Sequence, residues 1–213
     1  MRLNKLLMCA ALCVACTDSA QAPPDPDVLE LPATPVAKSA RGNIRFKGPE
    51  RLNTDFATAL ELRPESVCLE LGLYPCTAAV HNVALGGVDP YGAGLYESPN
   101  ATATTTPIVA ERVAWTACTQ RVSADLDNPS AAVIFRGVPL SGKKLGNVDG
   151  PEVRGVIGLL TQRVYLRNPY RNELERYVRL AKDIEATATA EPARAWMQAV
   201  CFAILSSAES VFY

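Results

Sequence analysis

The sequence of 213 residues contains a single histidine, His81, and has almost no net charge. Lysine and arginine together number 21 against 22 aspartate and glutamate residues, so the chain lacks the electrostatic footprint of a nucleic-acid-binding protein. One histidine and dispersed carboxylates do not make a specific metal cluster. His81 also lies five residues after Cys76, so there is no C-x-x-C-H haem attachment motif. We therefore expect no nucleic acid, no bound metal and no cofactor.

The sequence also lacks a complete catalytic or nucleotide-binding motif. No serine stands in a G-x-S-x-G frame. The stretch GVPLSGKK (137–144) follows AAVIF (131–135), which could form a buried strand, and so matches part of a P-loop. A working P-loop needs a Ser or Thr hydroxyl where this chain has Lys144, and it opens directly into a helix, whereas LGNVDGP follows here. We expect a flexible turn, no bound nucleotide and no enzymatic activity.

The apolar run near the N-terminus is too short to cross a membrane. It extends from Leu6 to Ala15 after Arg2 and Lys5, whereas a spanning helix needs about 20 residues. A charged start with a short apolar run is typical of a signal peptide. The run ends in LCVAC, which resembles the lipobox of bacterial lipoproteins, with Cys13 in place of the usual leucine. That resemblance implies a lipoprotein signal peptide over residues 1–15 and acylation of Cys16.

Acylation of Cys16 would anchor the protein in the lipid bilayer of the cell envelope, with its domain in the periplasm. Thr17 follows the cysteine where an Asp would suggest inner-membrane retention, so the outer membrane is favoured. Residues 16–43 are rich in Pro, Ala, Asp and Ser, a composition that cannot build a core and predicts a tether. One alternative is a secretory peptide cut at Ala20-Gln21-Ala22, which would leave a soluble secreted protein, although Pro23 would then disfavour cleavage. An uncleaved anchor is the other alternative.

Four cysteines remain beyond the signal region, and an exported chain meets an oxidising compartment. They allow three pairings, of which we favour the near pair Cys68–Cys76 with the far pair Cys118–Cys201. Free buried thiols that behave as small hydrophobic groups are the alternative.

From residue 44 onward the helical period dominates, and residues 44–213 are predicted to form one mainly α-helical domain. Proline opens several of the expected helices, because its missing N–H group costs nothing in the first turn. We expect a disulfide-stapled domain of five to six helices with a long Gly/Pro-rich loop. The expected helices begin at Pro49, near residue 77, at Pro107, at Pro151, after Pro169 and at Pro192, the last with Trp196, Val200, Ile204, Ala208 and Val211 facing inward.

The segment GGVDPYGAGLYE (86–97) is the part that packing explains least. Its glycines permit unusual backbone angles, and its tyrosines and carboxylates could recognise another protein. The candidate partner-contact residues are His81, Asp89, Tyr91, Tyr96 and Glu97. A well-packed irregular turn is the structural alternative, and a hydrolase that uses His81, Asp89 and Glu97 is the enzymatic one, although no nucleophile is found.

The C-terminal helices resemble a small helical domain of unknown function that occurs in large exported proteins of the planctomycete type, usually beside cytochrome c modules. The matching residues are Arg167, Pro169, Glu173, Leu174, Arg176, Tyr177, Ala203, Ile204, Leu205, Ser207, Phe212 and Tyr213. Ala208 stands where that domain has proline. The resemblance implies a setting near extracytoplasmic redox proteins and implies no catalytic residue. Charged pairs such as Glu173 with Arg176 are expected on the solvent face.

Two functions follow as expectations. The first is a non-enzymatic, membrane-anchored envelope lipoprotein that acts as an interaction or structural module and contacts another envelope protein. The alternative is an accessory subunit of an extracytoplasmic cytochrome c or other redox system, without a haem of its own.

Overall fold

The computed structural model describes residues 44–98, 104–139, 144–187 and 190–213. The predicted signal peptide, Cys16 and the tether lie outside the described residues, as do positions 140–143 of the P-loop-like turn. The described residues are mainly helical and carry two disulfides, so the expectation of a disulfide-stapled helical domain is confirmed.

Six α-helices make up most of the described chain, and proline stands in the first turn of four of them, as predicted. Their bounds are α1 Pro49–Leu60, α2 Thr106–Asp127, α3 Pro151–Tyr165, α4 Arg171–Ala186, α5 Pro192–Leu205 and α6 Ala208–Val211. Short helical turns add Pro64–Ser66 (η1), Cys76–Val80 (η2, a π-helical turn) and Pro129–Ala131 (η3).

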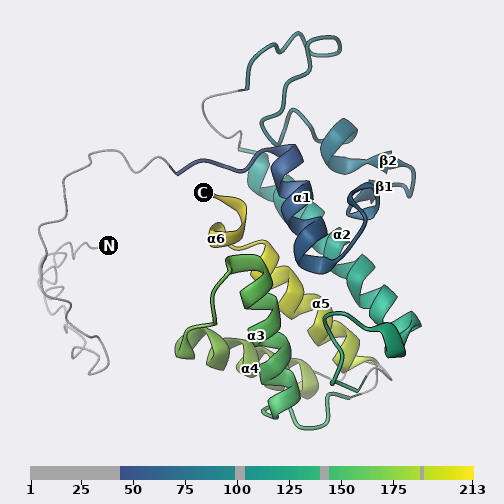
Figure 1. The fold of residues 1–213 in the computed structure, drawn as a ribbon, viewed down its shortest axis with the longest axis vertical. Coiled ribbons are helices and arrows are strands. Elements are labelled where there is room, and N and C mark those ends of the chain that lie inside the picture. Colours follow the sequence, from purple (N-terminus) through teal and green to yellow (C-terminus); the bar gives the residue numbers. More distant parts are fainter. Residues whose placement is uncertain (1–43, 99–103, 140–143, 188–189) are drawn as a thin grey trace, which may run out of the picture. The chain divides into compact units, whose positions relative to one another are not determined.

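Helix α5 lies at the centre of the helical packing and contacts α2, α3 and α4 (Figure 1). Its side chains are apolar on nearly every face, which is typical of a helix surrounded by others. Trp196, Val200 and Ile204 are fully buried, as their spacing predicts. The disulfide Cys118–Cys201 joins α2 to α5, with a Cα–Cα distance of 5.7 Å.

The last helix is shorter than the sequence predicts, because the chain turns at Ser206 and Ser207 and restarts as α6. The prediction that Ala208 faces inward is therefore wrong, since Ala208 is exposed at the start of α6, whereas Val211 is buried. The Ser207 hydroxyl accepts a hydrogen bond from the backbone N–H of Ser210, an N-cap that starts the new helix. The hydroxyl of Tyr165 lies 2.7 Å from Ser207 Oγ and 3.0 Å from the carbonyl oxygen of Ile204. These bonds satisfy backbone groups that a continuous helix would have paired internally.

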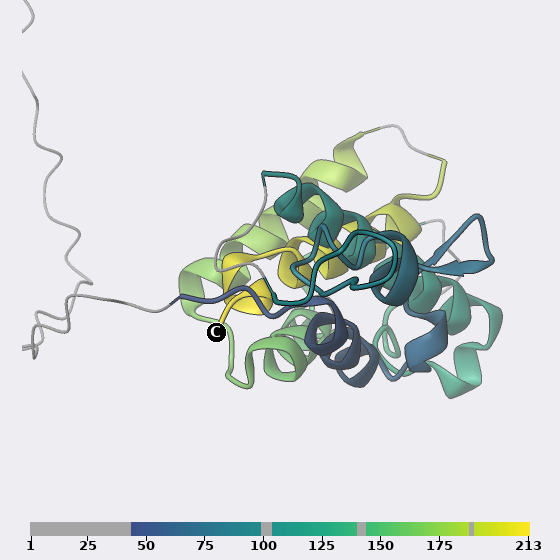
Figure 2. The ribbon, with the colours of Figure 1, turned by 90° about the horizontal axis from the view of Figure 1, so that it is seen from above.

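The two ends of the described chain pair with each other. Phe46 and Phe212 form an antiparallel bridge, and their rings pack edge to face with centroids 5.8 Å apart. Figure 2 shows the first described residues running beside the C-terminal segment.

A two-stranded hairpin and its disulfide precede η2, where the sequence predicts only a short helix near residues 77–84. Strand β1 (Leu69–Glu70) pairs with β2 (Tyr74–Pro75), and Glu70 lies opposite Tyr74. The disulfide Cys68–Cys76 closes the base of this hairpin, so both predicted disulfide pairings are confirmed.

The interpretation of AAVIF as a strand is wrong. Val133, Ile134 and Phe135 form no strand, and their backbone N–H groups donate to the Asp125 carboxylate at distances of 2.9–3.0 Å. A side-chain carboxylate therefore satisfies the buried amides that a neighbouring strand would otherwise have paired.

Candidate interaction surface

The loop 86–97 is closed by hydrogen bonds around Asp89. The backbone of Asp89 pairs with that of Leu95 in both directions, at 2.9 and 3.0 Å, and its Oδ1 accepts from the N–H of Gly92 at 2.8 Å. A Cβ atom at position 92 would lie 2.6 Å from Asp89 Oδ2, so glycine allows this close approach. The Asn82 side-chain amide donates to the carbonyl of Val88 at 2.7 Å. Asp89 thus shapes the turn.

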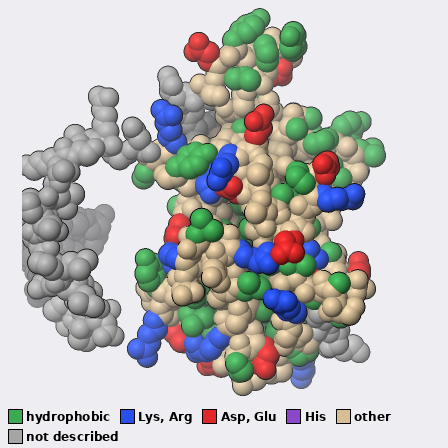
Figure 3. Space-filling view, in the orientation of Figure 1, with side chains coloured by type: hydrophobic (Ala, Val, Ile, Leu, Met, Phe, Trp, Pro, Cys, Tyr) green, Lys and Arg blue, Asp and Glu red, His purple; other side chains and the backbone are tan. Residues whose placement is uncertain are grey.

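The tyrosines of this loop point to solvent. Tyr91 is 99% exposed and Tyr96 is 78% exposed, and Glu97 is exposed as well. Figure 3 shows hydrophobic and acidic side chains gathered at the end of the molecule where Figure 1 places the loop. Tyrosine is enriched at protein interfaces because it combines a large apolar ring with a polar hydroxyl. The loop therefore presents two such groups on a closed turn.

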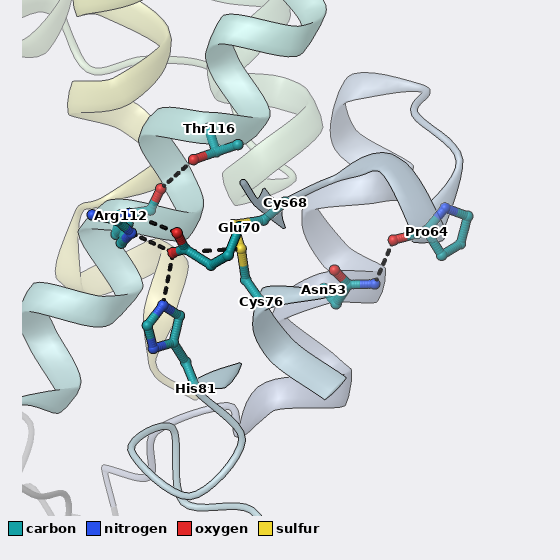
Figure 4. Close-up of a disulfide and its surroundings, with 8 residues drawn as sticks. All are labelled: Asn53, Pro64, Cys68, Glu70, Cys76, His81, Arg112 and Thr116. Carbon is teal, nitrogen blue, oxygen red and sulfur yellow. Dashed lines mark hydrogen bonds and ion pairs between the residues drawn. A yellow bond between two sulfur atoms is a disulfide. The ribbon is translucent and has the colours of Figure 1, made fainter. Parts of the chain in front are cut away.

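His81 takes part in a different cluster, beside the Cys68–Cys76 disulfide (Figure 4). Its Nε2 lies 2.9 Å from Oε1 of Glu70. Arg112, on α2, donates from Nε to Oε1 and from Nη2 to Oε2 of Glu70, the second bond at 2.7 Å. Oε1 also lies 4.0 Å from the sulfur of Cys76, which carries no proton in the disulfide, so this is a contact rather than a hydrogen bond. The side chains of His81 and Asp89 thus have different partners, Glu70 for His81 and the backbone N–H of Gly92 for Asp89.

The hydrogen bonds to Glu70 change the pKa of its carboxyl group. Arg112 first, and then His81, lower the pKa of Glu70 from 4.5 to about 2, because their hydrogen bonds favour the charged carboxylate. Sequence reasoning misses this cluster, since Glu70 and Arg112 are separated by 42 residues and form no motif. The pair fixes the hairpin against α2.

Two of the residues that carry the C-terminal resemblance, Arg167 and Glu173, form an ion pair in a cluster centred on Arg167. Its guanidinium makes two-point ion pairs with Glu173 and with Glu209, at distances of 2.6–2.8 Å. It also lies over the rings of Tyr170 and Tyr165, 4.2 and 5.1 Å from their centroids. The sequence suggests Arg176 as the ion-pair partner of Glu173, but in the structure the partner is Arg167. These contacts hold the start of α4 against α6, which is a structural role.

A small apolar pocket of about 180 Å³ lies where the first described residues meet α2 and the C-terminal turn. Its lining consists of Phe46, Thr106, Pro107, Ala110, Glu111, Ser206, Ala208, Val211 and Phe212.

Among the described residues, no group of three or more His, Cys, Asp or Glu side chains is placed to hold a metal ion. In the same part of the chain, no helix combines the length and apolar character needed to span a membrane.

Comparison with known proteins finds no relative of this chain. No protein-family model, curated protein or solved structure matches it.

Proposed function

We propose that this chain is a non-enzymatic envelope lipoprotein whose folded domain binds another envelope protein through the loop 86–97. The observation that carries the proposal is the exposure of Tyr91, which is 99% accessible on a turn held closed by Asp89. A large aromatic side chain in water gains free energy when a partner covers it, and a closed turn loses little conformational entropy on binding.

The lipid anchor in this proposal rests on the sequence. The apolar run ends at Cys16 in a lipobox-like frame, and a proline-rich segment separates that cysteine from the domain. Intact and peptide mass spectrometry of the protein purified from its membrane tests the anchor. An N-terminal acylated Cys16 is the expected result, whereas a free N-terminus at Pro23 would refute it.

Site-specific photo-crosslinking in cells tests the loop. A benzoylphenylalanine at position 91 should give a discrete adduct with one envelope protein, and the same probe at the exposed Tyr213 should not. Replacing Asp89 by Ala removes the acceptor for the Gly92 N–H and should weaken the adduct at position 91. Equal labelling from positions 91 and 213, or no adduct at either, would contradict the proposed binding surface.

A further inference from the structure

A second set of exposed apolar side chains comes from the two elements that the Glu70–Arg112 ion pair joins, the β1–β2 hairpin and α2. We call it the hairpin surface and define it by Leu71, Leu73, Tyr74, Ile108 and Trp115. Leu71 is 87% exposed, Leu73 is 73% exposed and Trp115 is 47% exposed, and the remaining two are also exposed. Clustered apolar side chains of this size in water mark sites of interaction with a protein or a membrane.

The ion pair brings these residues together. Ile108 and Trp115 lie four residues before and three residues after Arg112, so all three share one face of α2. Tyr74 is opposite Glu70 in the hairpin register, which places their side chains on one face of the two strands. Arg112 joins the two faces by binding Glu70, and the turn with Leu71 and Leu73 extends from them.

The tip of the hairpin holds a leucine in water, at a position with an uncommon backbone angle. Leu71 has a φ angle of 53°, in the left-handed region that L side chains rarely adopt, and its side chain is almost fully in water. The guanidinium at the centre of the surface is already neutralised by Glu70. The surface thus consists of apolar and aromatic side chains around a guanidinium whose charge is paired with Glu70.

We infer that the hairpin surface contacts the lipid bilayer to which Cys16 is attached, with the leucines and Trp115 in the headgroup region. This inference rests on the proposed lipid anchor. The 27 residues between Cys16 and Ile44 limit the start of the domain to at most about 100 Å from the anchor. Such tethering raises the effective concentration of bilayer at the domain surface, so a weak contact suffices. Leu, Tyr and Trp are the side chains that favour this interface.

Tryptophan fluorescence tests the inference, because the two tryptophans differ in exposure. Trp115 is half exposed and Trp196 is fully buried. The full acylated protein is reconstituted into vesicles of dioleoylphosphatidylcholine, with or without bromine on the acyl chains. Bromolipid should quench the Trp115 contribution roughly twofold, and Trp115→Phe should abolish the effect and leave the emission of Trp196. Quenching should persist at high salt, because apolar contact carries it.

A matched pair of variants controls for surface hydrophobicity. Leu71→Ser should reduce the bromine quenching of Trp115. Leu166→Ser should not, although Leu166 is equally exposed, at 87%, and also has a positive φ of 58°. Both sites are on the surface, so both variants should fold, which circular dichroism verifies.

The outcomes separate this inference from the proposed anchor. Protein that floats with the vesicles but shows no bromine quenching keeps the anchor and overturns the bilayer contact. Protein that fails to float overturns both. Quenching that disappears in high salt would mean that charge attraction holds the surface at the membrane, and it would overturn the inference. Shielding of Trp115 that depends on protein concentration and not on bromine would mean that a second copy of the chain covers the surface, and it would overturn the inference as well.

Discussion

Asp125 is a fully buried carboxylate that organises two parts of the chain. It accepts three backbone N–H groups from residues 133–135 and lies 2.7 Å from Nη2 of Arg121. Arg121 in turn donates to the carbonyls of Leu60 and Glu61, at the C-terminal end of α1, where a positive charge is favourable. The same ion pair therefore holds the loop after α2 and the end of α1.

Replacing Asp125 by Asn should lower the free energy of unfolding by about 3–5 kcal/mol, because Arg121 would be left as a buried charge without its counter-ion. Urea denaturation measures the change. Asp127→Asn is the matched control, since Asp127 is exposed two residues away and should change stability by less than about 0.5 kcal/mol. Similar losses in both variants would refute the role of the buried pair.

The lowered pKa of Glu70 predicts that the free energy of unfolding depends on pH. Its pKa in the folded chain, about 2, is below its ordinary value of 4.5, so its stabilising effect is present above about pH 5 and is lost as the pH falls toward 2. Glu70→Gln should therefore reduce the loss of unfolding free energy between pH 5 and 2, relative to the parent chain. Thermal denaturation as a function of pH measures this, with the exposed Glu65→Gln as control. A parent and a Glu70 variant with parallel pH profiles would contradict it.

At the scale of elements, short helices are held by side chains from outside them. Helix α6 has four residues, too few to be stable alone. Arg167 binds Glu209 in α6 and Glu173 in the first turn of α4. Glu173 also accepts the backbone N–H of Tyr170 at 2.8 Å, which caps α4. One guanidinium thus supports two helix starts.

Arg167→Lys should destabilise the protein by about 1–3 kcal/mol, because an ammonium cannot make two planar, two-point ion pairs or stack on both tyrosines. Arg171→Lys is the control, since Arg171 is exposed in the same region and should be nearly neutral. Chemical denaturation compares them. If the two variants are equally stable, the Arg167 cluster does not hold α4 and α6.

At the scale of the whole molecule, α2 and α5 form the largest helix pair, and the Cys118–Cys201 disulfide crosses it. The two cysteines are 83 residues apart, whereas Cys68 and Cys76 are 8 apart. A crosslink that closes a longer loop removes more conformational entropy from the unfolded chain. The far disulfide should therefore dominate the stability of the domain.

The double variant Cys118→Ala/Cys201→Ala should lose about 4–5 kcal/mol of unfolding free energy, and Cys68→Ala/Cys76→Ala about 2–3 kcal/mol. Urea denaturation without reductant measures both. A larger loss from the near pair would mean that the hairpin contributes more than its loop length implies.

The sequence by itself determined the elements whose signals are local. Proline at the start of α1, α2, α3 and α5, followed by apolar residues at helical spacing, needs no distant partner to be recognised. The disulfide pairing could also be predicted, because the four cysteines among residues 44–213 allow only three pairings. The exposure of Tyr91 and Tyr96 agrees with the interpretation of the loop 86–97 as a surface segment, while its role in binding stays a prediction.

Only the tertiary structure decided which distant side chains meet. The Glu70–Arg112 contact spans 42 residues, and Arg167–Glu209 spans the same number, so neither leaves a pattern in the sequence. The run AAVIF is apolar enough for a strand, yet whether it becomes one depends on the partner for its amides, and that partner is the carboxylate of Asp125. Local propensity acts within a few residues, whereas hydrogen-bond satisfaction in a core depends on the whole packed chain.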